Sequence, residues 1–111
     1  MTRSESARQL RVMADYASSG IWVIGAAPPP WRHGMIEHET LGISSVLAHR
    51  FDEWIAWYER DHTAGKLDAA RFEEEGLSLA GALKRELGSE VYVAFTPEPT
   101  DGQPVPSIAI E

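Results

Sequence analysis

Four histidines are the side chains of this sequence best suited to bind a metal ion or to transfer a proton. They are His33, His38, His49 and His62. Zinc needs three or four converging ligands, often with two of them in a His-x-x-x-His spacing on one helix. No pair of these histidines has that spacing, but a site built from His33, His38 and one of the helical pair His49 and Glu53 stays open. Solvated histidines explain the pattern better, and we expect no metal ion and no other cofactor.

Acidic side chains can act as a general acid and a general base when their surroundings split their pKa values. The candidates are Asp15, Glu37, Glu39, Asp52 and Glu53. Asp15 is the best placed of these, at the end of a predicted strand, although it could simply accept hydrogen bonds from the following turn. A pocket lined by Asp15, Tyr16, Trp22 and His33, between a sheet and a loop at residues 25–40, would suit a small-ligand-binding protein or a small enzyme.

The sequence lacks the motifs of the common catalytic centres. It has no cysteine, no Gly-x-Ser-x-Gly elbow, no Walker-type phosphate loop and no Gly-x-Gly-x-x-Gly segment. Small enzymes without such motifs exist, so this absence does not exclude an enzyme. It favours a protein that binds over one that transforms, and we predict no catalytic residue.

The four tryptophans offer a different kind of site, because exposed tryptophans are typical anchors of protein interfaces. Trp54 lies in the apolar stripe of a predicted helix and is expected in the core. Trp57 lies off that stripe and is expected to be half exposed. Trp31 follows Pro28-Pro29-Pro30 and either anchors a partner or folds back onto the core. We predict Trp31 and Trp57 as partner-binding residues.

The charge of the chain is concentrated in its second half. Residues 1–50 carry five basic and four acidic side chains, whereas residues 51–111 carry five basic and thirteen acidic ones, and the total is −7. Such a surface repels nucleic acid and would steer a basic protein partner. We predict that Asp52, Glu53, Glu73 and Glu74 supply this charge; that Glu73-Glu74-Glu75 is only a solvated helix face stays open.

Composition and length indicate one cytoplasmic domain. A chain of 111 residues with 43% hydrophobic side chains has enough material for one core. We therefore expect a single domain over residues 1–111, with residues 1–8 frayed. The lack of cysteine fits the cytosol. We also expect no signal peptide and no membrane segment, because the start of the chain and its longest apolar run do not suit either.

Two segments of alternating or β-branched residues open the chain and two helices follow. Residues 10–16 alternate apolar and polar, residues 17–20 suit a turn, and residues 21–24 resume as a strand, which predicts a β-hairpin. The three prolines predict a long loop over residues 25–40. A helix begins near Ser44 or Ser45.

A second helix begins after Asp68 and ends at Gly88. Its small residues Gly76 and Ala80 would allow a neighbour to approach closely. Residues 91–95 read as a strand and residues 105–110 as an edge strand. The predicted order β-β-α-α-β(β) gives an α+β fold, a small antiparallel sheet of three or four strands with two helices packed on one face.

Parts of the sequence resemble a family of small bacterial cytoplasmic proteins that includes the immunity partners of toxins. The resemblance rests on Leu10-Arg11-Val12-Met13-Ala14-Asp15-Tyr16 with Ser19-Gly20-Ile21-Trp22, and on Phe72-Glu73-Glu74-Glu75-Gly76 with Leu79, Leu83, Glu86-Leu87-Gly88 and Val91-Tyr92. It does not extend to the middle loop, so residues 28–31 are particular to this chain. The resemblance implies an acidic protein that is not an enzyme and that has a protein partner.

These observations together favour a non-enzymatic acidic protein-binding domain, an immunity protein that neutralises a bacterial toxin by occlusion. The small-ligand pocket described by Asp15 and its neighbours is the alternative function. A homodimer formed through an exposed sheet face also stays open.

Overall fold

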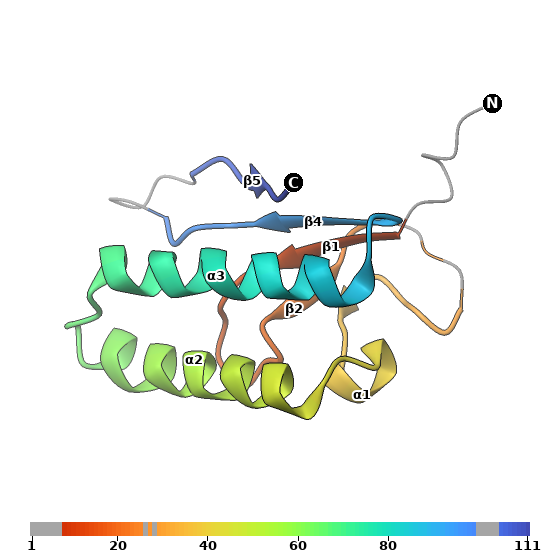
Figure 1. Ribbon diagram of the computed structural model, residues 1–111. Helices are drawn as coiled ribbons and strands as arrows, with labels where there is room; N and C mark the ends of the chain where they lie inside the picture. The colour runs from red at the N-terminus through yellow and green to blue at the C-terminus, as the bar shows by residue number, and fades with distance from the viewer. Residues whose placement is uncertain (1–7, 26, 28, 100–104) are drawn as a thin grey trace.

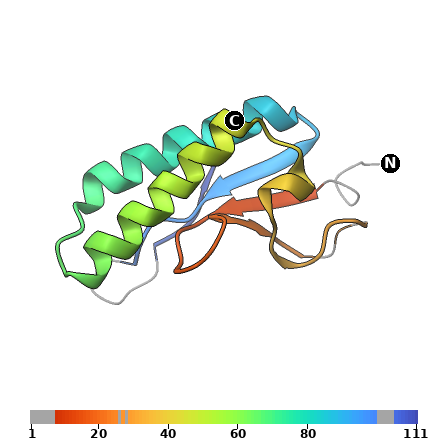
Figure 2. The same ribbon diagram turned by 90° about the horizontal axis from the view of Figure 1, so that it is seen from below.

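The computed structural model describes residues 8–25, 27, 29–99 and 105–111 and arranges them in two layers (Figure 1). Helices α2 (Ser45–Thr63) and α3 (Ala69–Leu87) lie side by side on one face of a sheet, and a short helix α1 (His38–Leu41) precedes them (Figure 2). The strands are β1 (Arg8–Val12), β2 (Ile21–Val23), β3 (Gly34–Met35), β4 (Val91–Phe95) and β5 (Ile108–Ala109). This arrangement confirms the predicted α+β class with two helices on one face.

The five strands follow the order β3-β2-β1-β4-β5, and all neighbours are antiparallel except β1 and β4. The parallel pair shows that the prediction of a wholly antiparallel sheet was wrong. The sheet has five strands, whereas three or four were expected. The helical hairpin is the cause. Helices α2 and α3 have 19 residues each and run in opposite directions, so the chain returns to the end of the sheet where β1 began (Figure 1). Strand β4 therefore runs in the same direction as β1.

Both long helices begin where their capping residues predict. Ser44 Oγ accepts a hydrogen bond from the Leu47 N–H at 3.1 Å, and Asp68 Oδ1 accepts one from the Arg71 N–H at 3.2 Å. Each bond satisfies a backbone donor of the first turn that has no partner within the helix. The Glu86 carboxylate accepts from the N–H and the hydroxyl of Ser44, at 2.8 and 2.6 Å, and thereby fastens the end of α3 to the start of α2.

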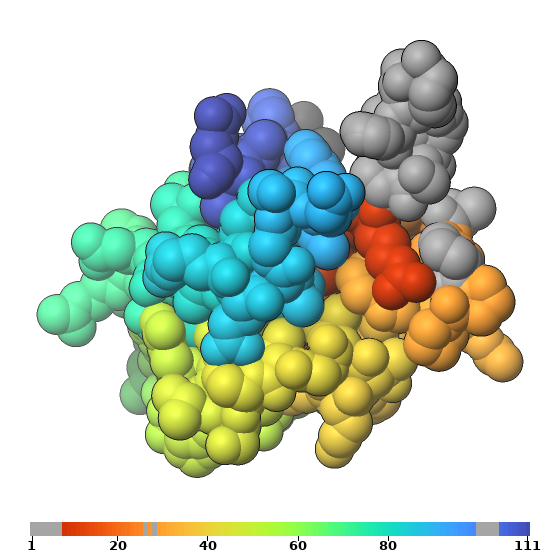
Figure 3. Space-filling view, turned by 45° about the vertical axis from the view of Figure 1, so that its right-hand side comes forward, coloured from red at the N-terminus to blue at the C-terminus, as the bar shows by residue number. Residues whose placement is uncertain are grey.

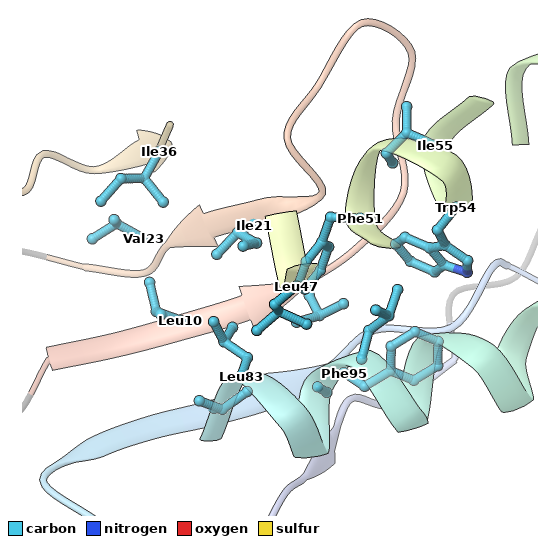
Figure 4. Close-up of a cluster of buried hydrophobic side chains, with 14 of the residues drawn as sticks. Leu10, Ile21, Val23, Ile36, Leu47, Phe51, Trp54, Ile55, Leu83 and Phe95 are labelled. Atoms are coloured by element: carbon cyan, nitrogen blue, oxygen red, sulfur yellow. The ribbon is translucent and has the colours of Figure 1, made fainter. Parts of the chain in front are cut away.

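The core fills the space between the sheet and the helices and contains the predicted apolar stripe of each helix (Figure 4). Its fully buried members include Leu10, Val12, Ile21, Leu47, Phe51, Trp54, Leu79, Leu83, Val93 and Phe95. Gly76 lets α3 approach closely, as predicted. A Cβ at Gly76 would lie 2.7 Å from Phe95 Cζ and 2.9 Å from Trp54 Cζ2, closer than real Cβ contacts.

Residues 25–40 are not the continuous loop that the prolines predict. Strand β3 pairs with β2, and α1 begins at His38. Trp31 is only 6% exposed, and the Arg8 guanidinium lies 4.6 Å from its ring centre. Figure 3 shows the start of β1 (red) against this segment (orange). The prediction that Trp31 is an exposed anchor is therefore wrong. Pairing of β3 brings the segment back over the sheet, where the indole gains by leaving water.

The two ends of the chain test the predictions of a frayed start and of a last edge strand. Arg8 begins β1 and is not frayed, whereas residues 1–7 lie outside the described residues. The expected last strand is β5, an edge strand that pairs with β4. No helix within the described ranges is long and apolar enough to cross a membrane.

Candidate functional site

A groove of about 570 Å³ lies between α2 and α3, and we call it the interhelix groove. Helix α2 contributes Arg50, Glu53, Trp54 and Trp57, and helix α3 contributes Arg71, Glu74, Glu75 and Ser78. Each set has spacings of three, one and three residues, which places its members on one face of its helix. Two helical faces that lie side by side thus present one continuous surface.

Trp57 forms an aromatic wall of the interhelix groove. It is half-buried, as predicted, and its ring meets the edge of the Phe72 ring at a centroid distance of 5.1 Å. Its Nε1–H donates to Asp61 Oδ2 at 3.1 Å. The hydrogen bond from Arg60 lowers the pKa of Asp61, and the bond from Trp57 acts in the same direction. Asp61 therefore stays ionised and holds the indole in place.

Trp54 makes the floor of the interhelix groove and is itself part of the core. Its ring stacks on Phe72, with the ring centres 4.5 Å apart and the planes 8° apart. Its Nε1–H donates to the Phe72 carbonyl oxygen at 3.2 Å, so the polar atom of the buried indole is satisfied. The floor is therefore rigid and apolar.

Guanidinium groups partly compensate the carboxylates of the interhelix groove. Arg50 Nη2 donates to Glu75 Oε2 at 3.2 Å and to Ser78 Oγ at 3.1 Å, and so links α2 to α3. Arg71 lines the same groove and lies three residues before Glu74 in the sequence. The groove thus combines an aromatic wall with charges of both signs, a composition suited to a protein surface.

Three of the six predicted partner-binding residues meet in the interhelix groove, namely Glu53, Trp57 and Glu74. Asp52 is exposed but lies near His38, whose Nδ1 is 3.9 Å from Asp52 Oδ1. Glu73 lines a separate cavity at the end of the sheet. Trp31 belongs to the core.

The four residues predicted for a small-ligand pocket do not share one cavity. Trp22 and His33 line a cavity of about 130 Å³, below the roughly 300 Å³ at which small-molecule sites begin. The Tyr16 hydroxyl lies 2.6 Å from His62 Nδ1, at the end of α2. Asp15 Oδ1 accepts from the Tyr16 N–H at 2.8 Å, whereas the backbone of residues 18–20 was expected to donate to it. These four residues therefore do not form one site for the alternative function.

The histidines make separate local contacts. His38 Nε2 lies 3.0 Å from the Ser19 carbonyl oxygen, and His49 Nε2 lies 3.2 Å from Glu53 Oε2, one helical turn away. His62 contacts the Tyr16 hydroxyl. In the part of the chain that the structure describes, no three His, Cys, Asp or Glu side chains form a group that could hold a metal ion.

Sequence reasoning missed Arg50, Arg71 and Ser78 of the interhelix groove, and it missed Glu98 at the end of the sheet. The helical period was a usable signal for the first three, because each lies three or four residues from a predicted groove residue. Glu98 follows β4 in an irregular segment, and no local pattern connects it with residues of α2 or α3.

Comparison with known proteins identifies a family. A family model described as Serratia CdiI immunity protein-like matches residues 8–98, which include both long helices and every residue of the interhelix groove. This match confirms the resemblance to toxin-immunity proteins. No curated protein matches the sequence.

Proposed function

The chain belongs to the Serratia CdiI immunity protein-like family, and from this premise we propose that it is a non-enzymatic cytoplasmic protein that binds a bacterial toxin and blocks it by occlusion. Membership in an immunity-protein-like family supports a toxin as the protein partner. The observation that carries the proposed docking site is the interhelix groove, in which Trp57 shares one surface with the carboxylates of Glu53 and Glu74.

A basic partner suits the charge of this surface. Residues 51–111, which contain most of α2 and all of α3, carry thirteen acidic and five basic side chains. Negative potential over one face accelerates encounter with a positive protein and penalises acidic competitors. The proposed toxin surface is therefore rich in lysine and arginine.

The size of the interhelix groove supports a role as the centre of a larger interface. A standard protein interface buries about 800 Å² on each partner, and its energy comes mainly from a few central aromatic and arginine side chains. Trp57 and Arg50 are side chains of those types within the groove. We assign Trp57 as the central anchor and the exposed carboxylates of Glu53 and Glu74 as the rim.

The experiment uses the full chain and the product of the gene beside its own, which is where a toxin is expected. Growth is measured while that product is expressed with the wild-type chain and with the Trp57→Ala variant. We expect the wild type to restore growth and to form a stable complex in size-exclusion chromatography. Loss of a buried aromatic anchor should weaken the complex by about 2 kcal/mol or more, which is roughly 30-fold in Kd.

Tyr92→Ala is the matched control, because Tyr92 is a 43% exposed aromatic residue on β4. It should protect as well as the wild type. Protection that survives Trp57→Ala but fails with Tyr92→Ala would move the docking site to the sheet. A neighbouring protein that is toxic but neither binds nor is neutralised would contradict the proposed function itself.

A further inference from the structure

A second cavity, of about 300 Å³, lies where the segments after β1 and β4 meet the start of α3, and we call it the end pocket. It is more enclosed than the interhelix groove. Its apolar walls include Trp54, Phe72 and Phe95, and its acidic residues are Glu73 and Glu98. Among the residues that the structure describes, no lysine, arginine or histidine lines it. An apolar cavity with carboxylates and no lining cation is complementary to a positive charge on an apolar stem.

Glu98 is the residue of the end pocket that most favours the binding of a positively charged group. Its Oε2 is buried, and no described residue donates a hydrogen bond to it. His62 Nε2 lies 3.8 Å from this oxygen, too far for a hydrogen bond, and forms an ion pair with it only when the imidazole is protonated. A buried carboxylate oxygen without a donor is unfavourable, so a donor brought by a partner would gain more here than at an exposed acid.

Tyr58 reports the same charge from the neighbouring helix. Burial raises the pKa of the Tyr58 phenol, and the Glu98 carboxylate raises it further. Glu98 acts both through its charge and through a side-chain hydrogen bond with Tyr58, so its carboxylate acts on the core side of α2.

We propose that the end pocket receives a basic side chain, lysine or arginine, of the protein partner, with the aliphatic stem against Phe72 and Phe95 and the charged head at Glu73 and Glu98. This inference rests on the proposed function for the identity of the partner. A bare metal ion fits less well, because the described residues hold no group of three ligands for it. An anion would be repelled by the two carboxylates.

The direct test titrates N-acetyl-arginine amide and N-acetyl-lysine amide into the full chain and follows the indole N–H signals by NMR. The Trp54 signal should shift and saturate at millimolar concentrations, and the neutral N-acetyl-norleucine amide should cause no such shift. Glu98→Gln and Glu73→Gln, which keep the size of the side chain, should each weaken binding by tenfold or more. Equal binding of the norleucine probe, or unchanged binding in both variants, would overturn the inference.

Glu75→Gln is the matched control, because Glu75 lies in the interhelix groove and is paired with Arg50. It should leave the titration of the Trp54 signal unchanged. Thermal unfolding of each variant verifies that the fold is retained. A titration abolished by Glu75→Gln as well would place the probe in the groove and overturn the inference.

A second measurement separates this inference from the proposed function. The dissociation rate of the complex with the neighbouring toxin should rise by tenfold or more in Glu98→Gln. If the toxin binds and this rate is unchanged, the inference fails and the proposed function stands. If the basic probes bind in a Glu98-dependent way and no toxin binds, the proposed function fails and the cation preference of the end pocket stands.

Discussion

The interhelix groove and the end pocket lie on two sides of one aromatic group, because Trp54 lines both. Their carboxylates have different surroundings. In the groove, Arg50 donates to Glu75, and Arg71 is a second lining cation. In the end pocket, no lysine or arginine of the described residues lines the cavity, and Glu98 Oε2 is buried without a hydrogen-bond donor from them, with His62 Nε2 3.8 Å away.

Because of this difference, we expect the two regions to affect different rates of binding, the association rate for the groove and the dissociation rate for the end pocket. Exposed and compensated charges act over distance, are screened by salt and mainly change the association rate. A buried and uncompensated charge has little effect at a distance and a large one in contact, so it selects the partner group and slows its release. We expect the groove to govern encounter and anchoring, and the end pocket to govern recognition of one basic side chain.

The largest effect should come from crowding Trp54, the side chain that both regions share. Gly76→Ala would place a Cβ against the Phe95 and Trp54 rings. This Cβ would lie 2.7 Å from Phe95 Cζ and 2.9 Å from Trp54 Cζ2. Overpacking of this kind costs about 1–3 kcal/mol. Urea unfolding should show this loss, and the shared aromatic wall should respond in both cavities through the Trp54 indole signal.

Gly81→Ala is the control for Gly76→Ala in the same helix. Its nearest neighbour would be the flexible Arg85 Nη1 at 3.5 Å. Removing a helical glycine without a clash should stabilise α3 by up to about 1 kcal/mol. Opposite signs for the two variants would confirm the close approach at Gly76. Equal stabilisation by both variants would show that the Phe95 and Trp54 rings can move aside, and it would contradict the close approach at Gly76.

The contrast between Gly76 and the residues around Glu98 shows what a sequence can predict. The helix starts at Ser44 and Asp68, the apolar stripes and the small residue at 76 are local signals with a period of 3.6, and all of them hold in the structure. The same period would also have given Arg50 from Trp57. Local sequence patterns are therefore sufficient to predict which residues share one face of one helix.

Contacts between distant segments could not be predicted in this way. The burial of Trp31 depends on β3, a strand of two residues whose Gly34 and Met35 carry no strand pattern. The parallel pairing of β1 with β4 depends on how the helical hairpin returns the chain. The end pocket depends on Glu98 reaching Phe72 and Phe95, which only the assembled sheet and helix bring together.

The next effect tests the uncompensated charge of Glu98 through the titration of Tyr58. Because the folded protein raises the pKa of Tyr58 above its ordinary value of 10.0, folding favours the neutral phenol. Stability is therefore complete below about pH 10 and falls as the pH rises further, by up to about 1.4 kcal/mol per pH unit. Urea unfolding over this alkaline range measures the slope.

Two variants test whether the raised pKa of Tyr58, and with it the loss of stability at alkaline pH, depends on Glu98 of the end pocket. Glu98→Gln should lower the pKa of Tyr58, since it removes the carboxylate that opposes ionisation, and burial alone should keep it raised. Glu75→Gln should leave the Tyr58 titration unchanged, because Glu75 is not among the groups that shift it. The tyrosinate absorbance gives both results. An unchanged titration in Glu98→Gln would mean that the charge of Glu98 is compensated after all.

A smaller effect should appear in the association rate with the toxin. The double variant Glu53→Gln/Glu74→Gln removes two exposed carboxylates of the interhelix groove. We expect the association rate to fall several-fold at low salt and the difference to shrink as salt rises, since the screening length is about 10 Å at 0.1 M. Stopped-flow fluorescence at several salt concentrations measures this. A change confined to the dissociation rate would contradict the assigned division between the two regions.

The smallest effect on stability, and the sharpest test of the comparison, comes from Arg50→Met. The Arg50 and Glu75 side chains are 35% and 40% exposed, so their ion pair is worth only about 0.2–1 kcal/mol. Methionine keeps an apolar stem against the groove but leaves Glu75 without its guanidinium partner. The groove then resembles the end pocket in charge, and the arginine probe should begin to shift the Trp57 indole signal, which it should not do in the wild type. If the probe still binds only in the end pocket, enclosure and not missing compensation is what distinguishes the two regions.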